Sequence, residues 1–263
     1  MATAAPMPIT RPPSPLLALT ELPRAMAEFG TLFPAAPLLA SAPRGDGHPV
    51  LVLPGFTTTD KSTAVLRRYL TNLGYDAHTW DLGRNLGPKA IGREGEKLVE
   101  RLDRCHQAIG RKVSLVGWSL GGVMARLVSR KRPEAVRQVI SLGSPFTGTP
   151  RATNVWRAYE LLTGQRIDDT QTKEQLREGA TPPPVPSTAI WSREDGIVAW
   201  QNCVEPFGEN SDNIEVHGSH CGLGVNPAVL YAVADRLALP EDGWRPFERS
   251  GLKAWFYPSA GHA

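Results

Sequence analysis

Short apolar runs alternate with amphipathic segments along most of the chain. The apolar runs have the length and composition of buried or half-buried strands. The predicted strands are Val50–Leu53, Tyr75–Asp81, Val113–Val116, Val136–Leu142, Ser187–Trp191 and Asn213–Val216. Tyr75–Asp81 is predicted from its alternation of apolar and polar positions rather than from an apolar run. A repeated order of strand and helix implies an α/β protein, in which a mostly parallel central sheet carries helices on both faces.

Helices are predicted wherever apolar positions recur every three or four residues. They are Ser14–Phe29, a helix capped by Asp60 or Ser62 and ending at Leu73, Ala90–Ile109, a helix ending near Lys131, Asn154–Leu162, Thr170–Arg177 and Pro227–Leu239. The fifth and sixth of these lie between two strands with no strand of their own. We therefore expect a short helical cap inserted at about 151–186. The predicted organisation is an N-terminal arm and helix over 1–47, followed by an α/β domain over 48–263.

One face of the predicted N-terminal helix is apolar. Its residues are Leu16, Leu17, Leu19, Leu22, Met26 and Phe29. The simplest interpretation is that this face packs on the body of the protein. The alternative is a surface that meets lipid, a polymer or a partner subunit.

Composition narrows the classes of protein that fit. The 263 residues are 41% hydrophobic and 21% charged, with a net charge of +3. The chain has no block of basic residues, so a nucleic-acid partner is not expected. It has no apolar run of about 18 residues and no signal-peptide pattern, so the expected location is cytoplasmic. Its three cysteines show no zinc-binding spacing, and no metal is expected.

The segment from Gly117 to Gly121 reads Gly-Trp-Ser-Leu-Gly and lies between a predicted strand and a predicted helix. A G-x-S-x-G sequence in that setting is typical of a nucleophile on a sharp turn, where glycines two positions before and after the serine avoid steric clashes. Ser119 is therefore the candidate nucleophile.

A serine nucleophile needs a general base, and the base needs a carboxylate that orients it. Of six histidines, His217 and His220 follow the last predicted strand, and His220 is favoured because it lies in a glycine-flanked loop. Asp195 follows the preceding strand and precedes a glycine. Glu194 and Asp212 are the competing acids. The resulting order of serine, aspartate and histidine is that of the α/β-hydrolase arrangement.

The tetrahedral intermediate of acyl transfer needs two hydrogen-bond donors. The backbone N–H groups of Leu120 and Phe56 are the candidates, and the Thr57 hydroxyl could assist. Trp118, Thr57 and Phe146 are predicted to contact the substrate because they flank these positions.

These motifs resemble those of the α/β-hydrolase superfamily, and in particular bacterial serine esterases and lipases. The resemblance extends from about Pro49 to Leu239 and rests on five segments. They read LPGF, GWSLGG, GSPFTGT, SREDGIV and GSHCGL. It implies a serine carboxylester hydrolase that needs no cofactor. Two departures from many lipases, a Pro-Gly pair at the oxyanion loop and a short cap, argue against long-chain triglycerides as substrates.

Other interpretations stay open at this stage. An acyltransferase or a polyester depolymerase could use the same triad, and a non-catalytic binding protein could share the fold. Cys203 and Cys221 follow the acid and the base, so a disulfide between these two loops is an alternative to two buried thiols. The substrate's acyl chain and alcohol and the oligomeric state are not indicated.

Overall fold

A single parallel sheet forms the centre of the molecule. The computed structural model describes residues 10–167, 169, 178–206 and 208–258. The strands are β1 (Pro49–Leu53), β2 (Asp76–Thr79), β3 (Val113–Trp118), β4 (Val136–Leu142), β5 (Ser187–Trp191) and β6 (Ser211–Glu215). Their order in the sheet is β2-β1-β3-β4-β5-β6, and every neighbouring pair is parallel. The predicted fold class is confirmed.

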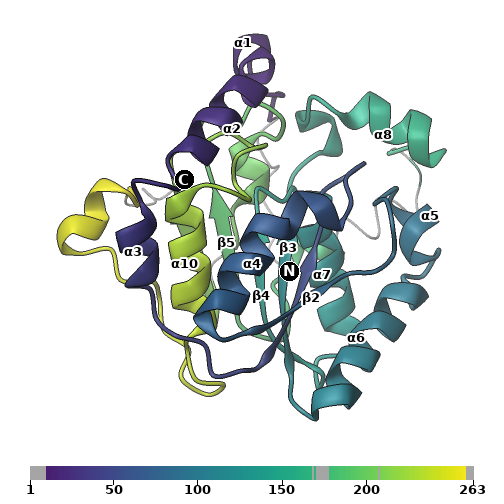
Figure 1. The fold of residues 1–263 in the computed structure, drawn as a ribbon. Coiled ribbons are helices and arrows are strands. Elements are labelled where there is room, and N and C mark those ends of the chain that lie inside the picture. The colour runs from purple at the N-terminus through teal and green to yellow at the C-terminus, as the bar shows by residue number, and fades with distance from the viewer. Residues whose placement is uncertain (1–9, 168, 170–177, 207, 259–263) are drawn as a thin grey trace, which may run out of the picture.

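Helices precede, connect and follow these strands (Figure 1). The α-helices are α1 (Pro15–Leu19), α2 (Glu21–Gly30), α3 (Ala36–Ala40), α4 (Ala64–Leu73), α5 (Pro88–Ile91), α6 (Glu96–Ile109), α7 (Leu120–Lys131), α8 (Trp156–Thr163) and α10 (Pro227–Leu237). The short 3-10 helices of the described residues are η1 (Asp60–Thr63), η2 (Pro150–Ala152), η3 (Trp200–Cys203) and η4 (Gly251–Trp255). Among the described residues, no helix combines the length and apolar character needed to cross a bilayer.

Two apolar layers cover the sheet, because neighbouring side chains of a strand point to opposite faces. In β1, Val50 and Val52 join a cluster with α4 and α10, whereas Leu51 and Leu53 join a cluster with α6 and α7. All four side chains are buried. The parallel strands therefore all end at one edge of the sheet, and the loops that follow them gather there.

Several helix boundaries differ from the predictions for local reasons. The predicted helix over 90–109 breaks into α5 and α6, because Gly92 and Gly95 adopt positive φ angles of 90° and 77°. The predicted helix over 14–29 divides at Thr20, whose hydroxyl donates to the Leu16 carbonyl. Helix α3 falls in a segment for which no helix was predicted. The predicted helix Thr170–Arg177 lies outside the described residues.

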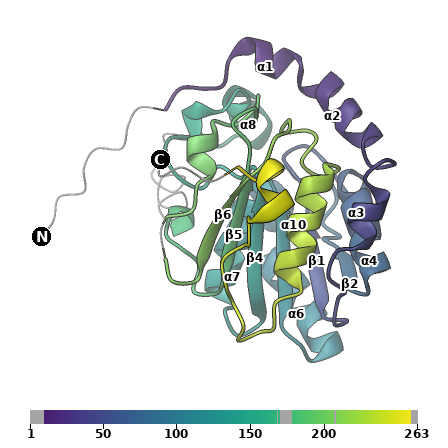
Figure 2. The same cartoon turned by 90° about the vertical axis from the view of Figure 1, so that its left-hand side faces the viewer.

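The N-terminal helices pack with the face opposite to the one expected. Leu16, Leu19, Leu22, Met26 and Phe29 are between 56% and 80% exposed. The polar face of α2 lies against the body instead, and the first interpretation of the apolar stripe is wrong. Figure 2 shows α1 and α2 running as an arc along the same end of the molecule as α8.

Candidate active site

Ser119 occupies a strained turn at the end of β3. Its φ of 53° and ψ of −121° are unusual for a residue with a side chain, and such backbone strain is characteristic of functional turns. The turn requires glycine on both sides. A Cβ atom on Gly117 would lie 2.4 Å from the Gly121 carbonyl oxygen, and one on Gly121 would lie 2.5 Å from that of Leu53. The geometry is therefore that of a nucleophile elbow.

His220 and Asp195 form a buried hydrogen-bonded pair. The His220 Nδ1 lies 2.6 Å from Asp195 Oδ2, and the two side chains are 7% and 1% exposed. Asp195 Oδ1 accepts the backbone N–H groups of Ile197 and Val198 at 2.8 and 2.7 Å. These two bonds hold the carboxylate so that its other oxygen faces the ring. The other ring nitrogen, Nε2, makes no hydrogen bond to a described residue and can accept a proton.

The net charge around the ring favours its protonated form. Burial alone lowers the pKa of His220, but the charge and hydrogen bond of Asp195 raise it, and the charge of Glu21 adds to that effect. The two carboxylates prevail, and the pKa of His220 lies above its ordinary value. An imidazolium formed during catalysis would be stabilised by the same carboxylates.

The elbow and the base loop are connected beside the serine. The Trp118 indole Nε1 donates to the His220 carbonyl at 3.1 Å. Gly143 ends β4 next to the pair, where a Cβ atom would lie 3.1 Å from His220 Nδ1 and 3.2 Å from Asp195 Oδ2. Within the described part of the chain, Ser119 Oγ makes no hydrogen bond to the His220 ring. In free enzymes such catalytic hydrogen bonds are often long, and they shorten when substrate binds.

The loop after β1 approaches the elbow closely. A Cβ atom on Gly55 would lie 3.5 Å from Ser119 Cβ. The Thr57 N–H donates to the Asn85 carbonyl at 2.7 Å, and the Thr57 hydroxyl donates to the Phe56 carbonyl at 2.7 Å. Both Thr57 donors are thus engaged.

The Phe56 N–H makes no hydrogen bond to any other described residue. The same is true of the Leu120 N–H, which is at the first position of α7. These two groups are therefore available as donors.

Phe146 does not have the position expected of a substrate contact. Its side chain is fully buried, and the Arg126 guanidinium lies over its ring at 3.8 Å. Arg126 is itself buried in an ion pair with Glu205. The expectation for Phe146 is therefore corrected, because this aromatic ring belongs to the core. Trp118 is half-buried and directs its N–H to the base loop rather than outward.

The competing base and acid pair with one another at the surface. His217 Nδ1 lies 3.0 Å from Glu194 Oε1, and their side chains are 63% and 49% exposed. Asp212 instead accepts the Phe247 N–H at 2.7 Å and forms an ion pair with Arg249 at 3.2 Å. None of these three side chains makes a hydrogen bond or ion pair with the Ser119 turn among the described residues.

A second hydrogen-bonded set of a serine, a histidine and an aspartate lies at the opposite ends of the strands. His48 Nδ1 is 2.5 Å from Asp46 Oδ1, and its Nε2 is 2.8 Å from Ser114 Oγ. Ser114 is fully buried near the start of β3, and His48 is fully buried as well. A substrate cannot reach this serine, so we interpret these hydrogen bonds as a structural link between β1 and β3.

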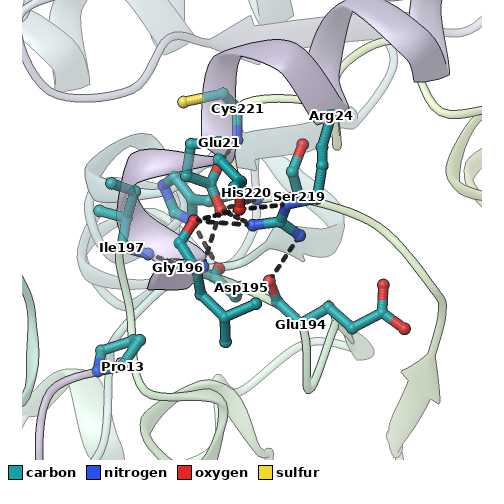
Figure 3. Close-up of polar contacts among 12 residues, drawn as sticks. Pro13, Glu21, Arg24, Glu194, Asp195, Gly196, Ile197, Ser219, His220 and Cys221 are labelled. Atoms are coloured by element: carbon teal, nitrogen blue, oxygen red, sulfur yellow. Dashed lines mark hydrogen bonds and ion pairs between the residues drawn. The ribbon is translucent and has the colours of Figure 1, made fainter. Parts of the chain in front are cut away.

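Three polar residues contact the loops of the candidate site, although the sequence offered no reason to expect them there. Glu21, Arg24 and Glu28 of α2 bind the loops that carry Asp195 and His220. Figure 3 shows the contacts of Glu21 and Arg24. Their spacing places them on one face of the helix, opposite the exposed apolar side chains. That spacing was the available signal, but it shows neither which face is buried nor what it contacts.

The cysteines are free thiols rather than a disulfide. Cys203 is buried, and its thiol lies 3.9 Å from the Ala199 carbonyl. Burial and the neighbouring charge of Glu21 raise the pKa of the Cys221 thiol to about 12. Neither thiol is suited to act as a nucleophile, because both are held protonated.

Comparison with solved structures defines the fold. Lipase B of Aspergillus fumigatus matches with a TM-score of 0.56 and 18% identity, over 76% of this chain and 54% of that chain. The pyrethroid hydrolase PytH matches with a TM-score of 0.54 and 17% identity, over 74% of this chain and 99% of that chain. An α/β superfamily hydrolase from Oenococcus oeni matches with a TM-score of 0.51 and 17% identity, over 73% of this chain and 91% of that chain.

The chain therefore has an α/β-hydrolase fold. It spans about half the length of the fungal lipase that it matches. No protein-family model matches the sequence. At identities this low, the comparisons support the fold, and the activity has to be argued from the site itself.

Proposed function

We propose that the protein is a serine carboxylester hydrolase with Ser119, His220 and Asp195 as its catalytic triad. The observation that carries this proposal is the combination of a strained serine elbow with a buried histidine–aspartate pair at the same edge of the sheet. The lipases and hydrolases among the structural neighbours agree with hydrolysis in general.

The proposed reaction has two halves. His220 Nε2 takes the proton from Ser119 Oγ as this oxygen attacks the ester carbonyl carbon. The N–H groups of Leu120 and Phe56 donate to the resulting oxyanion. When the carbon–oxygen ester bond breaks, His220 gives its proton to the departing alcohol. Water then attacks the acyl-enzyme with His220 again as base, which releases the acid and restores Ser119.

The decisive experiment compares two serine-to-alanine variants. We expect Ser119→Ala to lower kcat on p-nitrophenyl esters by about 10⁴-fold or more and to abolish labelling by a fluorophosphonate. Ser114→Ala is the matched control, because this serine belongs to the buried set with His48 and Asp46. This variant should keep both ester hydrolysis and labelling. Full activity in Ser119→Ala would refute the proposal. A folded wild-type protein that hydrolyses no ester in a short-to-long-chain panel and is not labelled would favour a non-catalytic binding protein.

Acyl transfer and polyester cleavage remain alternatives at the same site, since they differ only in the acceptor or the ester. Product analysis in the presence of competing alcohols distinguishes transfer from hydrolysis.

We also propose that the exposed apolar face of α1 and α2 meets a lipid surface that presents ester substrate. Two features support this: both helices expose large apolar side chains, and the opposite face of α2 contacts the loops of the candidate site.

A further inference from the structure

Glu21 is a buried carboxylate outside the triad, and it touches both triad loops. Its side chain is 3% exposed. Oε1 accepts the Gly196 N–H at 2.7 Å and the His220 N–H at 3.1 Å, and Oε2 accepts the Cys221 N–H at 2.8 Å. One side chain thus joins the acid loop to the base loop, as Figure 3 shows.

Neighbouring residues of α2 strengthen this connection. Arg24 donates to Glu21 Oε1 at 2.9 Å and to the Glu194 carbonyl at 2.8 Å, so it pairs with the buried charge and binds the acid loop. Glu28 accepts the Ser219 N–H and hydroxyl, each at 2.7 Å. The helix therefore holds the base loop at two separate points.

The catalytic loops are shaped to receive these helices. A Cβ atom on Gly196 would lie 2.4 Å from the Leu17 carbonyl oxygen, and one on Gly222 would lie 2.3 Å from Glu28 Oε2. Neither glycine has a positive φ. Close approach of the α1 backbone, rather than backbone conformation, therefore explains the glycine at position 196, and glycine at position 222 leaves room for the Glu28 carboxylate.

We propose that Glu21 is a positioning residue of the triad, which fixes Asp195 and His220 relative to one another by binding the backbone of both loops. This inference rests on the proposed function. Glu21 touches neither the substrate nor the reacting atoms, and it acts through the residues it holds. Without it, the buried N–H groups of Gly196 and His220 and the half-buried N–H group of Cys221 would lack an acceptor. The two loops would also lose the only side chain that, among the described residues, bonds the backbone of both Gly196 and His220.

The test is the Glu21→Gln variant, which keeps the shape and one carbonyl oxygen but removes the charge. We expect kcat to fall roughly 10- to 100-fold with a smaller change in KM, because small displacements of catalytic groups have effects of that size. Gly30→Ala, at an exposed position of the same helix where a Cβ atom meets no other atom within 4 Å, is the control and should match the wild type.

The pH profile separates positioning from a general loss of stability. The charged or titratable groups near His220 are Asp195, Glu21, Arg24 and Cys221, while the exposed His217–Glu194 pair is common to all variants. Glu21 raises the pKa of His220, so its removal should move the acidic limb of kcat/KM to lower pH, since the base works when neutral. Arg24→Met, which leaves Glu21 unneutralised, should move the limb the opposite way.

The outcomes distinguish the two proposals. If the wild type is active and labelled at Ser119 but Glu21→Gln retains its kcat and its acidic limb, the positioning role is refuted and the triad stands. If the wild type is neither active nor labelled, the proposed function fails first. If Glu21→Gln does not fold, Arg24→Met decides, and an unshifted limb in that folded variant overturns the inference.

Discussion

Replacing Gly196 by alanine tests whether the N-terminal helices and the acid loop pack as described. The added Cβ would lie 2.4 Å from the Leu17 carbonyl oxygen, 2.5 Å from its carbon and 2.7 Å from the Ala18 nitrogen. All three atoms are backbone atoms of α1, so no side chain can rotate away. Because Gly196 has no positive φ, the alanine itself introduces no conformational strain.

The size of the effect follows from the displacement that this contact demands. Relieving it requires α1 to move by about 1 Å, and overpacking of this kind destabilises proteins by about 1–3 kcal/mol. For a chain of this length each kcal/mol lowers Tm by roughly 2–4 °C. The same displacement would lengthen the hydrogen bond from Gly196 to Glu21, so we expect kcat/KM to fall by roughly tenfold or more.

The assay pairs thermal unfolding with ester hydrolysis at saturating and limiting substrate. Gly30→Ala is the matched control, because a Cβ there meets no atom within 4 Å and the residue lies on the same helix as Glu21. This control should keep the wild-type activity and Tm or gain slightly in Tm. An unchanged Tm and activity in Gly196→Ala would show that the helices do not pack on the acid loop in this way.

Three further predictions follow from the same structure. Because the pKa of His220 is raised above its ordinary value of 6.5, wild-type kcat/KM should increase with pH through a limb above that value, and a limb below it in a pH–rate profile would contradict the described pair. Arg126→Ala should destabilise the fold by about 3–5 kcal/mol in urea unfolding, since it leaves the Glu205 carboxylate buried without its cation; a loss under about 1 kcal/mol would contradict the buried pair. The double variant Leu19→Ser and Leu22→Ser should bind liposomes more weakly while hydrolysing a soluble short-chain ester normally, and unchanged liposome sedimentation would remove the proposed lipid contact.

The sheet could be predicted from the sequence because its evidence is local. The four central strands, β1, β3, β4 and β5, are rich in buried apolar residues, and the alternation of strands with helices dictates parallel pairing. The elbow at Ser119 was equally accessible, since its glycines are required within five consecutive residues. The meeting of Asp195 with His220 was predicted by a different route, because loops that follow parallel strands converge at one edge of the sheet.

What the sequence did not indicate depends on contacts between distant segments. Glu21 bonds to residues 175 to 200 positions away, and no local pattern specifies such a contact. Phe146 follows a strand end and therefore suggested a substrate contact. Its burial beneath Arg126 depends on where α7 lies against the loop after β4. For Phe146, the position along the chain predicted that the residue lies at the edge of the sheet, but not the direction of its side chain. For Glu21, it predicted neither the location nor the contacts.

The orientation of α2 can be explained by the needs of the loops it covers. Turned the other way, the helix would bury apolar side chains, each worth about 1.5–3 kcal/mol when fully buried. The N–H groups of Gly196, His220 and Cys221 would then be covered without acceptors, at about 1–3 kcal/mol each, and the Glu21 bonds that satisfy them would be lost. The two terms are of similar size, so burial of apolar area alone does not decide the orientation. The polar face also joins the two loops of the candidate triad, whereas the apolar face would leave them unconnected.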